Sequence, residues 1–246
     1  MRIGIFGGTF NPVHFGHLRV AEEVRESVGL DRIIFLPSGT PPLKTEDIAP
    51  APHRLAMTRL AIKENPLFAV LDLECRSRHK SYTVQTMERL RELYPDDLLY
   101  FMLGIDAFLD IPNWYRPDVL ILHTNFLVLS RPGYRFADLS ASPCLSVKKD
   151  ILRKLDAGTM GAHTATLDGG NTVSLVNVSP VIISATDIRT LAAQGKSIKY
   201  LLPAEVESYI ISENLYVSGK RKHRTVTGDV AEEQGRGPHG SRSSPR

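Results

Sequence analysis

Residues 2–19 read RIGIFGGTFNPVHFGHLR, and this stretch decides the fold. The apolar run Ile3–Phe6, with isoleucine at alternate positions, predicts a buried strand. Gly7-Gly8 predicts the end of that strand, because glycine permits a sharp turn and leaves no side chain between the backbone and a ligand. Beyond the turn dipeptide Asn11-Pro12, apolar residues recur every three to four positions, at 18, 21, 24 and 28, which is typical of a helix. A strand, a glycine turn and a helix form half of a nucleotide-binding unit, whose turn amides point toward a bound phosphate.

Two histidines follow the glycine turn. His14 and His17 are three residues apart, so we expect them to share one face of the first helical turn. Imidazole can donate hydrogen bonds to phosphate oxygens whether it is neutral or charged. An H-x-x-H pair alone is typical of a surface helix start, but the glycine turn directly before it favours a phosphate-binding role.

The rest of the chain alternates between strand and helix patterns. Further strands are expected at 32–36, 68–73, 98–103, 126–129 and 173–178, and helices at 52–65, 83–94, 118–123, 147–155, from 184, and at 203–214. This order predicts an α/β fold, a Rossmann-like doubly wound parallel sheet in a single domain with helices on both faces. In the segment 134–170 we expect one helix surrounded by loops.

Composition narrows the class of protein. The chain has 246 residues, of which 42% are hydrophobic, enough for a real core. Its apolar runs fall short of a membrane span, and a strand that begins at residue 3 argues against a signal peptide. Cys75 and Cys144 form no C-x-x-C pair, and the eight histidines show no zinc-like spacing with them. We therefore expect a cytoplasmic protein with free thiols, no membrane partner and no metal held by protein ligands alone; a homo-oligomer is left open.

The net charge of +3 is unevenly distributed. Residues 219–246 hold seven Lys or Arg and three Asp or Glu, so this tail carries +4 and the rest of the chain −1. The tail is rich in Gly, Arg and Ser and is predicted to be disordered, which sets the domain at 1–218. An RNA or acidic partner for the basic run 220–224 is the less favoured interpretation, and a nucleic-acid partner is not expected.

A second motif, ISATDIR, spans Ile183–Arg189. Its Ser184 and Asp187 fit a capping box that opens a helix, and Arg189 lies one turn further, within reach of a phosphate at the helix N-terminus. In open α/β sheets the ligand crevice lies beyond the carboxyl ends of the strands. Three other groups follow predicted strands in the same way: Lys44, Gly104 to Asp106, and Arg131.

These motifs carry a family resemblance. G-G-T-F-N-P-x-H-x-G-H at 7–17 and the ISATDIR segment resemble the two signatures of the nucleotidylyltransferase superfamily. The loop Pro41–Lys44, the helix entry Ser81-Tyr82-Thr83, and Gly104-Ile105-Asp106 followed by Trp114 are similar to the nicotinate mononucleotide adenylyltransferases. The similarity covers residues 1–217, is weak at 134–170 and is absent from the tail.

The resemblance implies a reaction and a set of site residues. It implies adenylyl transfer from ATP to nicotinate mononucleotide, with Mg²⁺ bound through the ATP phosphates, and His14, His17 and Arg189 as catalytic residues. ATP would contact these three and also Gly7, Gly8, Thr9, Phe10, Gly104, Asp106, Ser184 and Thr186. The mononucleotide would lie near Lys44, Tyr82, Thr83, Trp114 and Arg131, with Trp114 stacking on the pyridine ring.

Alternatives of two kinds stay open at this point. The substrate could be nicotinamide mononucleotide or phosphopantetheine, or the transfer could be cytidylyl. In a different class, the chain could be a dinucleotide-dependent oxidoreductase or a non-catalytic dinucleotide-binding module. The glycine turn disfavours that class because it lacks G-x-G-x-x-G, and the second strand ends in Pro37 rather than in an acidic ribose ligand.

Overall fold

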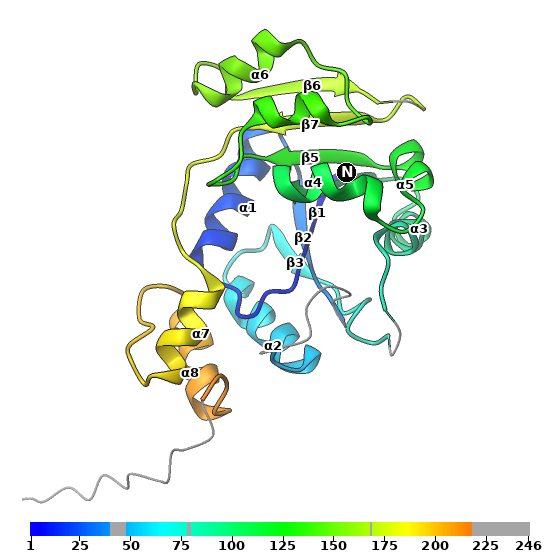
Figure 1. Cartoon of the computed structure of the whole chain (residues 1–246). Coiled ribbons are helices and arrows are strands. Elements are labelled where there is room, and N and C mark those ends of the chain that lie inside the picture. The colour runs from blue at the N-terminus through cyan, green and yellow to red at the C-terminus, as the bar shows by residue number, and fades with distance from the viewer. Residues whose placement is uncertain (40–47, 78–79, 168, 218–246) are drawn as a thin grey trace, which may run out of the picture.

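A computed structural model describes residues 1–39, 48–77, 80–167 and 169–217, which build one seven-stranded sheet (Figure 1). The strand order is β3-β2-β1-β4-β5-β7-β6. The strands are β1 (Arg2–Gly8), β2 (Arg32–Pro37), β3 (Phe68–Val70), β4 (Leu98–Gly104), β5 (Asn125–Leu129), β6 (Ala162–Thr166) and β7 (Thr172–Val176). The winding reverses between β1 and β4, so their carboxyl ends frame the crevice where open α/β sheets bind ligands.

Helices cover both faces of the sheet. One face packs against α1 (Phe15–Ser27), α2 (Ala51–Ile62), α7 (Ala185–Ala193) and α8 (Ala204–Ser212). The other packs against α3 (Thr83–Leu93), α4 (Ile105–Asp110), α5 (Pro117–His123), α6 (Lys149–Asp156) and the 3₁₀ turns η1 (Ile111–Asn113) and η2 (Phe136–Ala141).

The interior strand β5 shows why the sheet is buried on both sides. Phe126 and Val128 face the core beneath α3–α6, whereas Leu127 and Leu129 face the core beneath α1 and α7. All four side chains are at most 4% exposed. Burial of one such side chain stabilises the fold by about 1.5–3 kcal/mol, so a continuous apolar strand is stable only between two helical layers.

The expected doubly wound α/β fold is confirmed, with one correction to the sheet. The strand β6 was not predicted: residues 134–170 were expected to hold one helix among loops. β6 pairs antiparallel with β7, so the sheet is not purely parallel. Its sequence, AHTAT, alternates exposed and half-buried positions at the sheet edge and has no apolar run to signal a strand.

Smaller differences concern element ends. The third strand stops at Val70 rather than at residue 73, and the strand expected at 173–178 runs from Thr172 to Val176. β1 includes the two glycines that were expected to end it. The helix expected at 147–155 is α6.

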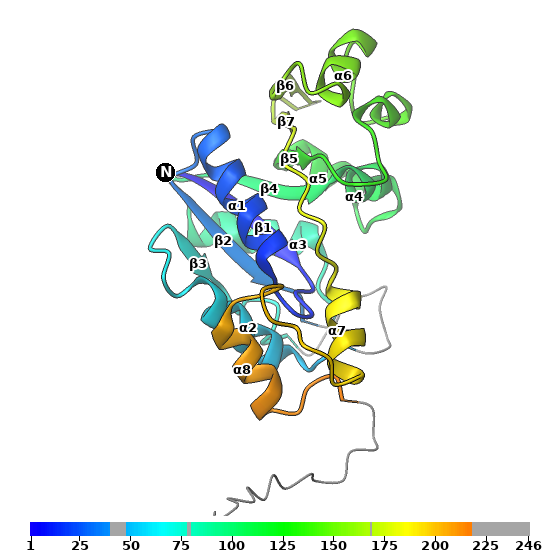
Figure 2. The same cartoon turned by 90° about the vertical axis from the view of Figure 1, so that its left-hand side faces the viewer.

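A long connection, residues 177–184, leads from β7 to α7 and descends alongside α1 (Figures 1 and 2). Glu23 of α1 holds it, because one carboxylate oxygen accepts hydrogen bonds from the Ser179 amide at 2.8 Å and the Ser179 hydroxyl at 3.1 Å. The Val178 amide also donates to the Ser130 hydroxyl at 2.9 Å. The ISATDIR segment therefore begins seven residues beyond the end of β7 and reaches the site through a braced connection.

Two expectations concern other parts of the chain. None of the helices that the structure describes has the length and apolar character that a membrane crossing needs. The basic tail 219–246 and the boundary at 218 lie outside the described residues.

Candidate functional site

The two motif histidines meet at the start of α1. His14 is the N-cap, with extended backbone angles (φ −150°, ψ 170°), and His17 lies three residues later in the first turn. Their ring centroids are 3.7 Å apart at an interplanar angle of 33°. The His14 amide donates to Nδ1 of His17 at 3.3 Å. A neutral His17 therefore carries its proton on Nε2, which leaves that N–H as a donor. The expected shared face is confirmed.

Both imidazoles are neutral near pH 7. Burial lowers the pKa of His14 to about 4, and Nδ1 of this ring is buried with no hydrogen-bond partner. Burial, assisted by the charges of His14 and Arg131, lowers the pKa of His17 well below its usual range. The charge of Arg131 acts on His17, so the segment after β5 and the start of α1 approach the same place.

Asn11 joins the turn to three other segments. Its side-chain oxygen accepts from the Ala49 amide at 3.1 Å and from the Tyr216 hydroxyl at 2.8 Å, and its carbonyl accepts from Arg189 at 3.0 Å. Arg189 also donates to the Thr186 hydroxyl at 3.3 Å. The sequence indicated a turn at Asn11 but gave no signal for Tyr216, which lies 205 residues away.

Ser184 caps α7 as predicted. Its hydroxyl accepts from the Asp187 amide at 3.4 Å. With Arg189 on the turn at Asn11, the N-terminal end of α7 lies at the edge of the sheet where α1 begins. Thr186 and Arg189 also line a cavity of about 620 Å³ with residues 48–50 and 214–217. Neither histidine is among the described residues that line this cavity.

The carboxyl end of β4 carries an ion pair. Asp106 and Arg131 lie 2.5 Å apart, and the Arg131 side chain is 58% exposed. The second carboxylate oxygen of Asp106 is buried with no hydrogen-bond partner. A methyl group on Gly104 would lie 2.5 Å from that oxygen and 3.3 Å from Cδ of Arg131, so a larger residue there would require the carboxylate to shift. Gly104 is the N-cap of α4, and Asp106 lies in the first turn of that helix.

Two of the residues predicted for the mononucleotide, Tyr82 and Thr83, lie at the start of α3. Tyr82 is the N-cap of this helix and Thr83 its first residue, so unpaired amides of the first turn are available there. The Tyr82 ring lies 4.5 Å from that of Tyr115, a residue that sequence reasoning missed. The Trp114 indole donates to Asp110 at 3.0 Å and packs against the core. Lys44 lies outside the described residues.

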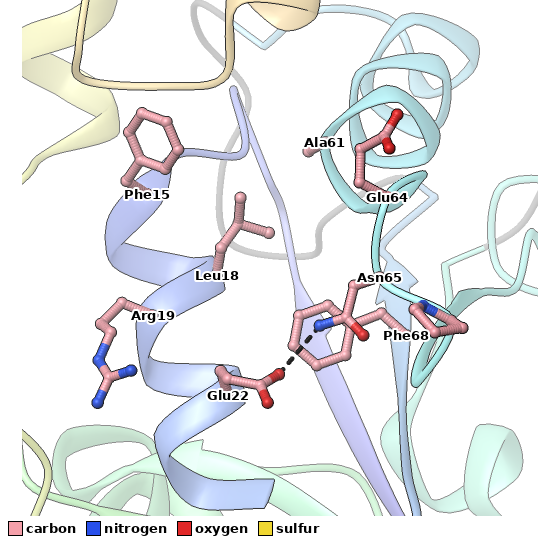
Figure 3. A pocket seen from close by; sticks show the side chains of 9 residues that line it. Phe15, Leu18, Arg19, Glu22, Ala61, Glu64, Asn65 and Phe68 are labelled. Carbon is pink, nitrogen blue, oxygen red and sulfur yellow. Dashed lines mark hydrogen bonds between the residues drawn. The ribbon is translucent and has the colours of Figure 1, made fainter.

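A separate groove of about 510 Å³ runs between α1 and the end of α2, as Figure 3 shows. It is lined by Phe15, Leu18 and Phe68 with polar groups such as Glu22, whose carboxylate accepts from the Asn65 side chain at 3.0 Å. None of the predicted site residues is among the described residues that line this groove. The groove is therefore distinct from the candidate site.

Fold and site together define a class of protein. A glycine turn, paired histidines at the start of α1 and an arginine from α7 meet at the switch point of an open α/β sheet. A family model described as Cytidylyltransferase-like matches residues 5–191. Proteins named probable nicotinate-nucleotide adenylyltransferase are 43% identical in Syntrophotalea carbinolica, over 90% of this chain and 100% of that protein, and 42% identical in Geobacter sulfurreducens, over 88% and 98%. The chain belongs to the nicotinate-nucleotide adenylyltransferase family, which confirms the resemblance read from its motifs.

Solved structures agree on the fold. Plasmodium falciparum nicotinic acid mononucleotide adenylyltransferase, complexed with NaAD, superposes with a TM-score of 0.65 at 22% identity, covering 87% of this chain and 97% of that chain. The same protein complexed with APC gives a TM-score of 0.63 over 87% and 96%.

Proposed function

We propose that the protein transfers the adenylyl group of ATP to nicotinate mononucleotide, giving deamido-NAD and pyrophosphate, a step in NAD biosynthesis. The family of the chain supports the substrate pair. The observation that carries the chemistry is the stacked, neutral pair His14 and His17 at the N-terminus of α1.

The reaction needs charge stabilisation more than proton transfer. A phosphate oxygen of the mononucleotide attacks the α-phosphorus of ATP, a new P–O bond forms, and the bond from that phosphorus to the bridging oxygen breaks. The attacking oxygen is already anionic, so no general base is required, and catalysis rests on positioning and electrostatics.

On the ATP side, the histidine N–H groups, the amides of residues 7–10 and the exposed first turn of α7 would hold the phosphates. A neutral imidazole keeps one N–H group and can donate it to a phosphate oxygen. The N-termini of the helices also favour anions. Arg189 would add a cation at the same turn, since its guanidinium already contacts the carbonyl of Asn11.

On the mononucleotide side, the first amides of α3 beyond Tyr82 and Thr83 would receive the pyridine carboxylate. The ring would stack on Trp114. Arg131 would lie near the phosphate, once it turns from Asp106, and Lys44 is assigned there by resemblance alone.

We also propose that ATP brings Mg²⁺, which would offset charge on the departing pyrophosphate. Among the described residues no group of three or more His, Cys, Asp or Glu could hold a metal. The described residues fit an ion that is bound by phosphate oxygens. The unpartnered carboxylate oxygen of Asp106 could add a single further contact to that ion. A cytoplasmic location remains part of the proposal, and a homo-oligomer is left open.

The test is pyrophosphate release from ATP with each acceptor. We expect fast release with nicotinate mononucleotide, slower release with the nicotinamide form and none with phosphopantetheine. Preference for the amide would contradict the assigned substrate. Tight binding of NAD with no release under any condition would support the non-catalytic module instead.

A further inference from the structure

A buried arginine lies behind the site and is not among the residues that the motifs predict. Arg54 belongs to α2 and is 1% exposed. Its Nε donates to the Ala49 carbonyl at 2.9 Å, and its two terminal nitrogens donate to the carbonyls of Thr9 at 2.7 Å and Gly39 at 2.6 Å. These carbonyls come from three segments: the turn after β1, the loop after β2 and the entry to α2.

Burying the Arg54 cation costs free energy, so a role in stability alone does not explain it. A buried cation loses its hydration, and burial lowers the pKa of Arg54. Within the described residues, no carboxylate lies at ion-pair distance from it, so three backbone carbonyls provide its compensation. Such a group is conspicuous at a place where two phosphorylated substrates are expected.

The contact with Thr9 orients the phosphate turn. In a planar trans peptide the carbonyl and the following N–H point in opposite directions, so holding the Thr9 carbonyl also fixes the Phe10 amide. Phe10 has a positive φ of 46°, a conformation that non-glycine residues rarely adopt, and it therefore needs such support.

The contact with Gly39 extends toward the other substrate. The Gly39 backbone contacts the backbone of Glu74, whose carboxylate accepts a hydrogen bond from the Thr86 hydroxyl at 2.8 Å. Thr86 lies in the first turn of α3, three residues after Thr83. A methyl group on Gly39 would lie 2.3 Å from the Glu74 carbonyl, so the two backbones are in close contact.

We propose that Arg54 and Glu74 are positioning residues that fix the phosphate turn relative to the start of α3, and thereby set the distance between the two reacting phosphates. The chain of contacts runs from Thr9 through Arg54, Gly39 and Glu74 to Thr86. The inference rests on the proposed function, because it assigns ATP to one end of this chain and the mononucleotide to the other.

The experiment compares Arg54→Lys and Glu74→Gln with matched controls, Arg25→Lys and Glu22→Gln. The control residues form a partly exposed pair on α1, 2.7 Å apart and away from the catalytic residues. Lysine keeps the charge of Arg54 but cannot reach three carbonyls in one plane, and glutamine keeps the shape of Glu74. Steady-state pyrophosphate release gives kcat and KM per folded enzyme, with the folded fraction taken from thermal unfolding.

We expect kcat to fall about 10- to 100-fold in each test variant while both KM values change less than about threefold, since misalignment by a fraction of an ångström acts on the reacting geometry. The controls should match wild type. Unchanged kcat per folded molecule, or a loss confined to KM, would overturn the proposal. If Arg54→Lys does not fold, Glu74→Gln decides alone.

A second readout does not depend on activity. Amide hydrogen exchange should increase in both 8–11 and 83–87 in each test variant, and in neither control. Increased exchange at only one of the two segments would refute the connection. If wild type releases no pyrophosphate, the proposed function fails, and the exchange data still test whether the two segments are linked.

Discussion

The buried imidazole of His14 makes stability depend on pH in a direction that the structure fixes. In the unfolded chain a histidine has a pKa of about 6.5, whereas burial holds that of His14 at about 4 in the fold. The unfolded chain therefore binds protons more readily, and acid favours unfolding. This contribution is fully present above the unfolded-state pKa and is lost as the pH falls toward 4. From these two values the loss at pH 5 is about 2 kcal/mol, with His17 acting in the same direction.

The assay is urea unfolding of wild type and of His14→Gln at pH 7.5 and pH 5. The wild type should lose about 2 kcal/mol more between the two conditions than the variant does, because glutamine does not titrate. His123→Gln, at the exposed end of α5, is the control and should keep the wild-type difference. Equal pH dependence in wild type and His14→Gln would refute the argument that burial keeps this ring neutral.

Three further outcomes can be checked. His17→Ala should remain folded and lower kcat by about 10²–10³, as for loss of one oriented donor, measured by pyrophosphate release; near wild-type turnover would contradict its role. Gly104→Ala should lower kcat/KM by about tenfold or more, because its methyl group displaces the pair Asp106–Arg131; a crystal structure with the pair intact would oppose this. Trp114 is the single tryptophan, so its fluorescence should change on adding nicotinate mononucleotide and not on adding ATP alone; no change with the mononucleotide would exclude stacking.

The parts of the fold that could be predicted are those with a strong local signal. The apolar runs of β1, β2, β4 and β5 are buried on both faces, so their composition alone marks them as strands. The edge strand β6 could not be predicted, because its polar residues meet a core on one side only and its partner β7 supplies most of the apolar surface.

The site residues, too, differ in whether the sequence could predict them. His14, His17, Ser184 and Arg189 belong to short segments whose spacing is informative by itself. Arg54 is different: in the sequence it is one cation beside Leu55 and Met57, and its three acceptors lie 5, 15 and 45 residues away. Interactions of that kind arise only from the folded chain.

The connection from β7 to α7 has a consequence for how the chain is held together. It carries Arg189 from the half of the sheet that contains β7 to the opposite half, where Ile188, Val206 and Ile210 share a core with Met57 of α2. The last two helices are thus retained by side-chain packing and not by a strand of their own. A single proteolytic cut near residue 181 should leave the two fragments associated but separate α7, which carries Arg189, from the brace at Glu23. The cut protein would then stay compact and lose turnover.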